Sequence, residues 1–468
     1  MLLASYVAAA AAMFVAALYL FLRLRPLLTT TTMLIGSLLL IYGPACLTYT
    51  ASSGSRAFLL HLLTNSIQFP DPIFAVIKAK IPDFDAVVTA MNFSIALMYL
   101  GIIAGIEAID RLFPKRIATM QASLTNWNAQ ALQDDIGSRR ILLIVISALV
   151  ALMFLISITE NHIATIWKFL SIQSDDANNL ARNAFRLHFA ASPNYFYRLI
   201  LSAVAPMFII WGLLAGGLSR SWPLLLATSL LFIATMIGKF DTLSKAPPVF
   251  FLIQLMVAAL LIFSNRITWR SALGGACVIA LMLYAITRLI MTFPQGYLVI
   301  EFVYYRVFEV ENQALLQNFA TFPFMHPFMW GANIRPIAIL MGLDYVPSYS
   351  VVAYTWSGTY DVTSPALFIA DAWADFSYAG VIVYSLIAGA VCRSIDAIFL
   401  VRGKTVVGVA VLGATFMGVF TLLVTALNTA LLSGGLLLAP ILAGLLVAAI
   451  RYSQRHPASP VEQVSQGK

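Results

Sequence analysis

Long apolar stretches alternate with short polar connections along most of this chain. A membrane-spanning helix needs about 20 apolar residues, and windows of that kind recur from the first residues to the region of residue 450. The pattern predicts an all-α polytopic integral membrane protein with about 11 transmembrane helices, in a range of about 10 to 12. The windows lie at 2–22, 33–50, 87–108, 140–158, 198–217, 222–238, 248–264, 271–293, 378–400, 405–426 and 431–450.

One stretch, residues 294–361, interrupts this pattern. Fifteen of its 68 residues are aromatic, about 22% against 12% in the whole chain, and charged side chains recur through it. The stretch is too charged for a spanning helix and too aromatic for a disordered tail. Because loops longer than about 15 residues in compact proteins are usually functional or disordered, we expect this stretch to carry the working part of the protein.

Composition and charge agree with a membrane protein, since 61% of the residues are hydrophobic, 10% are charged and the mean hydropathy is +0.89. Placing the N-terminus outside puts 16 of the 28 Lys and Arg residues inside, mostly in short connections where the positive-inside rule applies. We therefore expect a cytoplasmic C-terminus and two larger outer loops with short helices, at about 160–197 and 294–364. Residues 1–450 are expected to form one membrane domain and 451–468 a polar cytoplasmic tail.

Several classes of partner and cofactor are not expected. The net charge of +8 follows partly from the inside bias of the basic residues and predicts no nucleic-acid partner. The chain contains no nucleotide-binding run of the GxxxxGK[ST] or GxGxxG type. Cys46, Cys277 and Cys392 fall in or beside apolar windows without metal-ligand spacing. We expect buried cysteines, no metal site and no other cofactor.

Basic residues on the expected outer side are the first candidates for a site. Arg182 and Arg186 are one helical turn apart, so their guanidinium groups form a fork suited to phosphate or a sugar carboxylate. Lipid headgroups or aspartates of their own loop are the alternative partners. Lys239 and Lys245 adjoin span ends on the outer side, against the charge rule, and face either an anionic substrate or Asp241 and the headgroups. Arg288 lies in an apolar window, where a charge lines a cavity or reaches the headgroups.

The late outer loop adds further candidates. Its first part reads as a helix over 298–319 that carries Arg306 and Glu311, and Arg335 follows later. The proline-rich aromatic run 322–330 cannot form a regular helix. Non-helical backbone at membrane depth is tolerated where it lines a cavity. Aromatic faces also stack on sugar rings, although an interfacial aromatic belt explains part of this set without a ligand. The aromatic residues we assign to sugar stacking are Tyr305, Trp330 and Trp356.

Two carboxylates follow the loop on a short helix. Ser364 is expected to cap this helix, with Pro365 at its first position and Gly380 as its stop. Asp371 and Asp375 are four residues apart and project from one face. Neighbouring carboxylates that cannot both ionise cheaply are candidates for a general base. An ion pair with Arg335 or another arginine of the loop is the structural alternative.

From about 239 to 396 the chain resembles the O-antigen polymerase family, which polymerises lipid-linked oligosaccharide repeat units. The resemblance lies in a lysine-bearing turn before a span, here Ser244-Lys245, and in a large outer loop with arginines, here from Arg306 to Arg335. A short helix that runs into a span follows, here Ala370-Asp371-Ala372-Trp373-Ala374-Asp375-Phe376-Ser377-Tyr378-Ala379-Gly380. The layout of about eleven spans with one dominant late outer loop supports it further.

The resemblance implies a glycosyltransferase with a single transmembrane catalytic domain. Its substrates would be an undecaprenyl-pyrophosphate-linked glycan donor and a lipid-linked acceptor, joined at the periplasmic face of the bacterial inner membrane into O-antigen, capsule or exopolysaccharide. Membrane lipids and a chain-length regulator protein are the other partners implied. The carboxylates Asp371, Asp375 and Glu311 would supply the base. The cations Arg182, Arg186, Arg288, Arg306, Arg335, Lys239 and Lys245 would hold the pyrophosphate.

Two other functions remain open from the sequence. A flippase or transporter for a similar anionic lipid would also need intramembrane cations, although transporters commonly show internal repeats and broken helices at the midplane. An O-antigen ligase would pass the finished glycan to a lipid A core. It would need the same donor chemistry as a polymerase.

Overall fold

The fold is described from a computed structural model. It describes residues 1–25, 27–51, 72–134, 139–160, 195–241, 246–264, 308–359 and 366–455, with short pieces at 163–167 and 266–281. Within these ranges the chain is helical and forms no strand beyond two isolated bridges, Leu27 with Arg266 and Gln133 with Thr405. The all-α prediction is confirmed.

Eight helical segments of the described residues are long and apolar enough to cross a membrane. They are Leu2–Leu24 (α1, Leu2–Leu18, with η1, Tyr19–Leu24), Thr30–Ala51 (α2, Thr30–Tyr42, with α3, Pro44–Ala51), α6 (Phe84–Leu112), α8 (Arg139–Thr159), Tyr195–Ser219 (α11, Tyr195–Leu199, η3, Ile200–Val204, and α12, Ala205–Ser219), α13 (Trp222–Asp241), α20 (Phe368–Phe399) and α21 (Val406–Val424).

Two shorter apolar helices, α14 (Ala246–Phe263) and α23 (Leu438–Arg455), match two more of the expected windows. The remaining window, 271–293, lies mostly outside the described residues, so the count of about eleven stays a prediction. Cys46 and Cys392 are buried, but Cys277 is exposed, and its expected burial was wrong.

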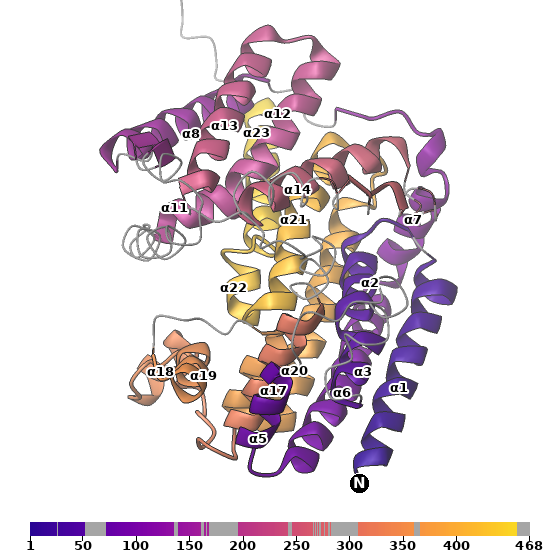
Figure 1. Ribbon diagram of the computed structural model, residues 1–468. Coiled ribbons are helices and arrows are strands. Elements are labelled where there is room, and N and C mark those ends of the chain that lie inside the picture. The colour runs from indigo at the N-terminus through magenta and orange to yellow at the C-terminus, as the bar shows by residue number, and fades with distance from the viewer. Residues whose placement is uncertain are drawn as a thin grey trace, which may run out of the picture.

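Short helices lie between the spans. They are α5 (Pro72–Lys80), α7 (Pro114–Thr125), η2 (Trp127–Ala129), α17 (Val310–Thr321), α18 (Arg335–Met341), α19 (Ser348–Ser357) and α22 (Leu427–Leu431). In Figure 1, α5, α17, α18 and α19 gather around the start of α20, and α18 and α19 stand out from the bundle. The expected helix over 298–319 is described only from residue 308 onward, and α17 begins at Val310.

The long helices form two groups that share α21. In one group α6 packs against α1 and α20, and in the other α13 packs against α8 and α12. α21 contacts α2 on one side and α12 and α14 on the other. Most of α21 is buried: 83% of the residues in its most apolar stretch are covered by protein. They are covered because helices of both groups pack against α21.

Small residues let α6 and α20 approach closely. A Cβ atom at Gly105 would lie 2.2 Å from the carbonyl oxygen of Leu386, and one at Gly389 would lie 2.2 Å from that of Ile102. Gly101 meets Ser385 in the same crossing. Small residues four apart on both helices are typical of membrane helix pairs, which gain their stability from close packing.

The bundle has two ends of different chemistry. We call the end with residues 23–25, 27–32, 107–134 and 393–405 the network end, and the end with residues 1–6, 80–92, 329–359 and 366–375 the carboxylate end. At the network end the bridges and the bond from Lys404 Nζ to the carbonyl of Ile262 (2.8 Å) join the connections between spans. Which side of the membrane each end faces stays a prediction.

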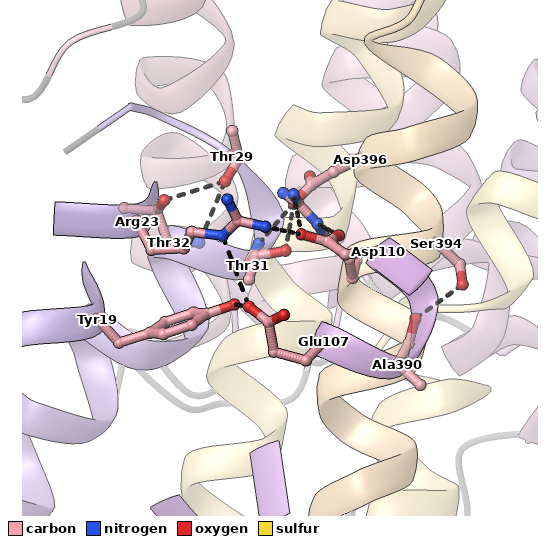
Figure 2. A network of polar contacts seen from close by, with 11 residues as sticks. Tyr19, Arg23, Thr29, Thr31, Thr32, Glu107, Asp110, Ala390, Ser394 and Asp396 are labelled. Carbon is pink, nitrogen blue, oxygen red and sulfur yellow. Dashed lines mark hydrogen bonds and ion pairs between the residues drawn. The ribbon is translucent and has the colours of Figure 1, made fainter. Parts of the chain in front are cut away.

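A buried ionic network holds the network end together (Figure 2). Arg393 of α20 donates from Nε and Nη2 to the carboxylate of Asp110 on α6, at 2.5 and 2.9 Å. One turn further along α20, Asp396 accepts from the backbone N–H groups of Thr30 and Thr31 at 2.8 and 3.0 Å, and from the Thr31 hydroxyl. These N–H groups begin α2 and have no partner within their own helix. Asp396 therefore joins the starting end of α2 to α20.

The start of α20 differs from the expected helix. It begins at Phe368, not at Pro365, with Leu367 at the cap position; the expected cap Ser364 lies outside the described residues. The helix breaks at Phe376 and Ser377, where the backbone leaves the helical region, and not at Gly380. At Gly380 a Cβ would lie 2.2 Å from the carbonyl oxygen of Ala372. The glycine is therefore needed for packing across the break.

Replacing Arg393 with Met should destabilise the protein strongly. It would leave the Asp110 carboxylate buried with only Arg23 at 3.6 Å, and removal of one member of a buried ion pair typically costs about 3 kcal/mol or more. Thermal unfolding of the full chain in detergent, followed by tryptophan fluorescence, would measure the effect. Arg402→Met, at an exposed arginine nearby, is the control. Equal midpoints for the two variants would contradict a stabilising role for the pair.

Candidate functional site

Asp371 and Asp375 meet at the carboxylate end, where the irregular segment after α17 crosses the start of α20. The backbone N–H of Met329 donates to the carbonyl of Ala374 at 2.8 Å, and that of Trp330 donates to the carbonyl of Asp375 at 3.1 Å. The break at 376–377 explains this pairing, because it frees the two carbonyls from their bonds along the helix. The run 322–330 is non-helical as predicted, and α20 satisfies part of its backbone.

Both carboxylate oxygens of Asp375 accept hydrogen bonds from the irregular segment that follows α17. Its Oδ1 accepts from the backbone N–H groups of Gly331 (3.0 Å) and Asn333 (3.4 Å), and its Oδ2 accepts from the Asn333 side chain (3.4 Å). The residue is completely buried. This geometry fits a positioning role, in which Asp375 holds the turn at 329–334 in place.

Asp371 has a different environment. Its Oδ1 accepts from Asn333 Nδ2 at 3.0 Å and from the Ser348 hydroxyl. No described residue donates a hydrogen bond to Oδ2, and Asp371 is partly exposed. Of the two carboxylates, Asp371 is therefore the one with an oxygen left for a ligand.

Asn333 joins the two carboxylates and fixes their relative positions. Its Oδ1 accepts from the backbone N–H of Ser348 at 2.8 Å. That bond orients the amide so that Nδ2 faces both Asp371 and Asp375. Neither Asn333 nor Ser348 was predicted. Asn333 lies in an irregular segment without a helical period, and Ser348 is the first residue of the short helix α19. The position of Asn333 soon after a proline-rich aromatic run was the one available signal.

A cavity of about 160 Å³ adjoins Asp371. Apolar side chains make up much of its wall, and a few polar groups interrupt them. The lining residues are Asn333, Ile334, Asp371, Tyr384, Ala426, Leu427, Asn428 and Leu431. The volume is smaller than that of a typical ligand pocket, about 300 Å³ or more. It can therefore admit part of a ligand, such as one hydroxyl-bearing ring edge, beside the carboxylate.

Aromatic side chains anchor the segment next to this cavity. Trp373 of α20 donates from Nε1 to the carbonyl of Phe322 at 2.6 Å and stacks on Phe319 with 4.8 Å between ring centroids. Phe328 meets the same indole edge-on at 5.5 Å. Trp373 was not predicted as part of the site, since it reads as one more apolar residue of a span.

The two described aromatics assigned to sugar stacking differ in their availability. Trp330 is 59% exposed and lies in the turn at 329–334 that Asp375 holds. Trp356 is partly covered, because its Nε1 donates to Thr321 Oγ1 (3.1 Å) and Lys80 Nζ lies 5.2 Å from its ring centroid. Lys80 also donates to the carbonyl of Thr355 at 2.7 Å and so links α5 to α19. Trp330 is the better placed of the two for a sugar ring.

The other expected residues are placed as follows. Arg335 is exposed at the start of α18 and forms no ion pair with Asp371 or Asp375, so the predicted alternative of such a pair was wrong. Glu311 lies on α17 and contacts neither aspartate; it is close enough to Tyr42 for an electrostatic interaction. Lys239 is buried at the end of α13, with Nζ 5.7 Å from the ring centroid of Phe251.

Six of the expected residues lie outside the described part of the chain. They are Arg182, Arg186, Lys245, Arg288, Tyr305 and Arg306.

Arg335 belongs to the electrostatic surroundings of the cavity through Tyr345. Burial raises the pKa of the Tyr345 phenol, and Tyr349 and the Asp371 carboxylate raise it further, while Arg335 lowers it. Among the described residues of the site, Arg335 is thus close enough to Tyr345 to interact with it electrostatically, and Tyr345 interacts with Asp371 in the same way. Among the described residues no group of three or more His, Cys, Asp and Glu side chains could hold a metal ion.

The comparisons with known proteins add no relative to this picture. The chain matches no protein-family model, no curated protein and no solved structure.

Replacing Asp375 with Ala should loosen the turn at 329–334, whereas Asp371→Ala should leave it in place. The first change removes the acceptor of two buried backbone N–H groups, each of which costs about 1–3 kcal/mol when left unpaired. Hydrogen exchange at Gly331 and Asn333 should accelerate by about 5-fold or more. Mass spectrometry of a peptide covering 328–335 would measure it. Equal exchange in the two variants would contradict the division of roles.

Proposed function

We propose that this protein is a membrane glycosyltransferase that polymerises oligosaccharide repeat units carried on undecaprenyl pyrophosphate. In this proposal it acts at the periplasmic face of the bacterial inner membrane. The observation that carries it is the Asp371 carboxylate: Oδ1 accepts hydrogen bonds from Asn333 and Ser348, no described residue donates to the other oxygen, and Asp371 lines a cavity. The resemblance of residues 239–396 to O-antigen polymerases supports the choice of reaction.

The proposed reaction is one glycosyl transfer. An acceptor hydroxyl attacks the anomeric carbon of the donor, and Asp371 takes the hydroxyl proton as general base. The bond between the anomeric carbon and the pyrophosphate oxygen breaks, and the lipid pyrophosphate leaves with the bonding electrons. The atoms balance without a further reactant. The base must lie within hydrogen-bond reach of the hydroxyl, and the cavity beside Asp371 gives a sugar ring edge that access.

The surrounding groups fit separate tasks in this reaction. Trp330 offers an exposed aromatic face for a sugar beside the base. Arg335 and the arginines outside the described residues would stabilise the negative charge of the leaving pyrophosphate. Asp375 and Asn333 would act as positioning residues, since their hydrogen bonds hold the segment that bears Trp330 and orient the carboxylate of Asp371.

Purified protein should convert lipid-linked repeat units into a ladder of longer products, and Asp371→Asn should slow this conversion by about 100-fold or more. The amide keeps the size of the side chain but cannot accept the proton. Gel electrophoresis of the glycans, with masses of the products, would measure the ladder. The matched control is Asp344→Asn, at an exposed carboxylate of the same region.

The outcomes separate the candidate functions. Unchanged substrate with well-folded wild-type protein would contradict the polymerase. Transfer only to a lipid A core would identify a ligase, and movement of the intact substrate across a vesicle bilayer would identify a flippase. A full-rate ladder from Asp371→Asn would remove Asp371 from the role of base.

A further inference from the structure

A second cavity lies at the network end, away from the proposed catalytic carboxylate. Its volume is about 420 Å³. Arg23 and Arg25 line it from η1 and the residue after it, and Arg393 lines it from α20. Among the described residues no carboxylate contributes to the lining. Because α20 separates Asp371 from Arg393 by roughly 30 Å of helix, the two cavities are distinct sites.

Helix α7 forms one wall of this cavity with small side chains. Ala118, Ala122 and Thr125 line it and follow the spacing of one helical face, with Gln121 beside them. The two alanines are small, so the backbone of α7 can border open space where a larger residue would fill it. Gln121 supplies a neutral amide donor, and the Thr125 hydroxyl donates to the backbone carbonyl of Gln121 at 2.9 Å. The wall therefore combines guanidinium groups on one side with small and polar groups on the other.

Two of the three arginines, Arg393 and Arg23, pair with carboxylates that do not themselves line the cavity. Arg393 uses Nε and Nη2 for Asp110. Arg23 lies 3.6 Å from both Glu107 and Asp110, and its side chain is 50% exposed. Figure 2 shows Arg23 directed toward these two carboxylates, and Tyr19 donates to Glu107 at 2.7 Å, which fixes the acid in turn. The paired arginines are thus fixed in position and still carry N–H donors that the carboxylates do not use.

Arg25 changes the charge of the cavity. It is exposed and forms no ion pair with a described residue. Within the part of the chain that the structure describes, no ion pair balances its positive charge. Guanidinium groups bind phosphate through several parallel N–H donors, and three of them converge on one cavity here.

We propose that this cavity binds a phosphate group, either free phosphate or the phosphate of a lipid headgroup. The bound phosphate would accept hydrogen bonds from Arg25 and Arg23 and from the side-chain amide of Gln121. It would join η1 and the residue after it to α7, two elements that are far apart in sequence. This site goes beyond the proposed glycosyl transfer, because it lies at the other end of α20 and takes no part in that reaction.

The test uses full-length protein purified in detergent without added phospholipid. One arm titrates inorganic phosphate at constant ionic strength and follows the thermal unfolding midpoint. The other arm adds phosphatidylglycerol and counts bound lipid by native mass spectrometry, with diacylglycerol as the lipid that lacks phosphate. Arg25→Gln and Ala122→Leu should each weaken binding by about 10-fold, the first by loss of a charged donor and the second by filling the cavity.

Arg116→Gln is the matched control, since Arg116 is an exposed arginine of α7 that does not line the cavity. Saturable inorganic phosphate binding that both cavity variants weaken would support a free-phosphate site. The same pattern for phosphatidylglycerol alone would support a headgroup site. Absence of binding in both arms would overturn the proposal, as would equal weakening by Arg116→Gln. Neither arm measures glycosyl transfer, so the two proposals can fail separately.

Discussion

The structure depends on one constraint: charged and polar groups of spanning helices need partners within the protein, because the bilayer core offers no water. At the network end the Arg393 guanidinium and the Asp110 carboxylate neutralise each other across α6 and α20. Asp396 then receives the N–H groups that α2 cannot satisfy at its own start. These contacts fix the positions of α2, α6 and α20 along their helix axes relative to one another. The glycine crossing of α6 and α20 fixes their separation.

The same constraint explains how irregular backbone persists at the carboxylate end. A segment without helical hydrogen bonds needs other acceptors for its N–H groups, and α20 supplies them by breaking. The break at Phe376 and Ser377 releases the carbonyls of Ala374 and Asp375, and Met329 and Trp330 bond to them. Asp375 adds its carboxylate for the next N–H groups in line. The break in α20 and the course of the loop are therefore one feature and not two.

Apolar periodicity predicted the helices well because a spanning helix is specified by its length and composition alone. Eight of the eleven windows overlap described helices that are long enough to cross a membrane, and two more overlap the shorter helices α14 and α23. Capping rules placed the start of α20 too early and its break too late, because the helix begins after the completely buried Leu367 and breaks at Phe376, directly after the two carbonyls that bond to the loop. Asn333 and Ser348 could not be predicted, since their role follows from contacts across 23 to 42 residues. The burial of Arg393 could not be predicted either, because its pairing with Asp110 is a contact across 283 residues.

The pairing of Asp371 with Asp375 illustrates how one helical spacing yields two roles. Sequence spacing treats the two carboxylates alike, since both project from one face. The loop then distinguishes them, because the turn at 329–334 covers Asp375 with three donors and leaves Asp371 at its margin. Asn333 is the element that makes this difference useful, since it donates to both acids and accepts from Ser348. In the proposed reaction, Asp375 sets the position of the loop, and the loop sets the position of the base.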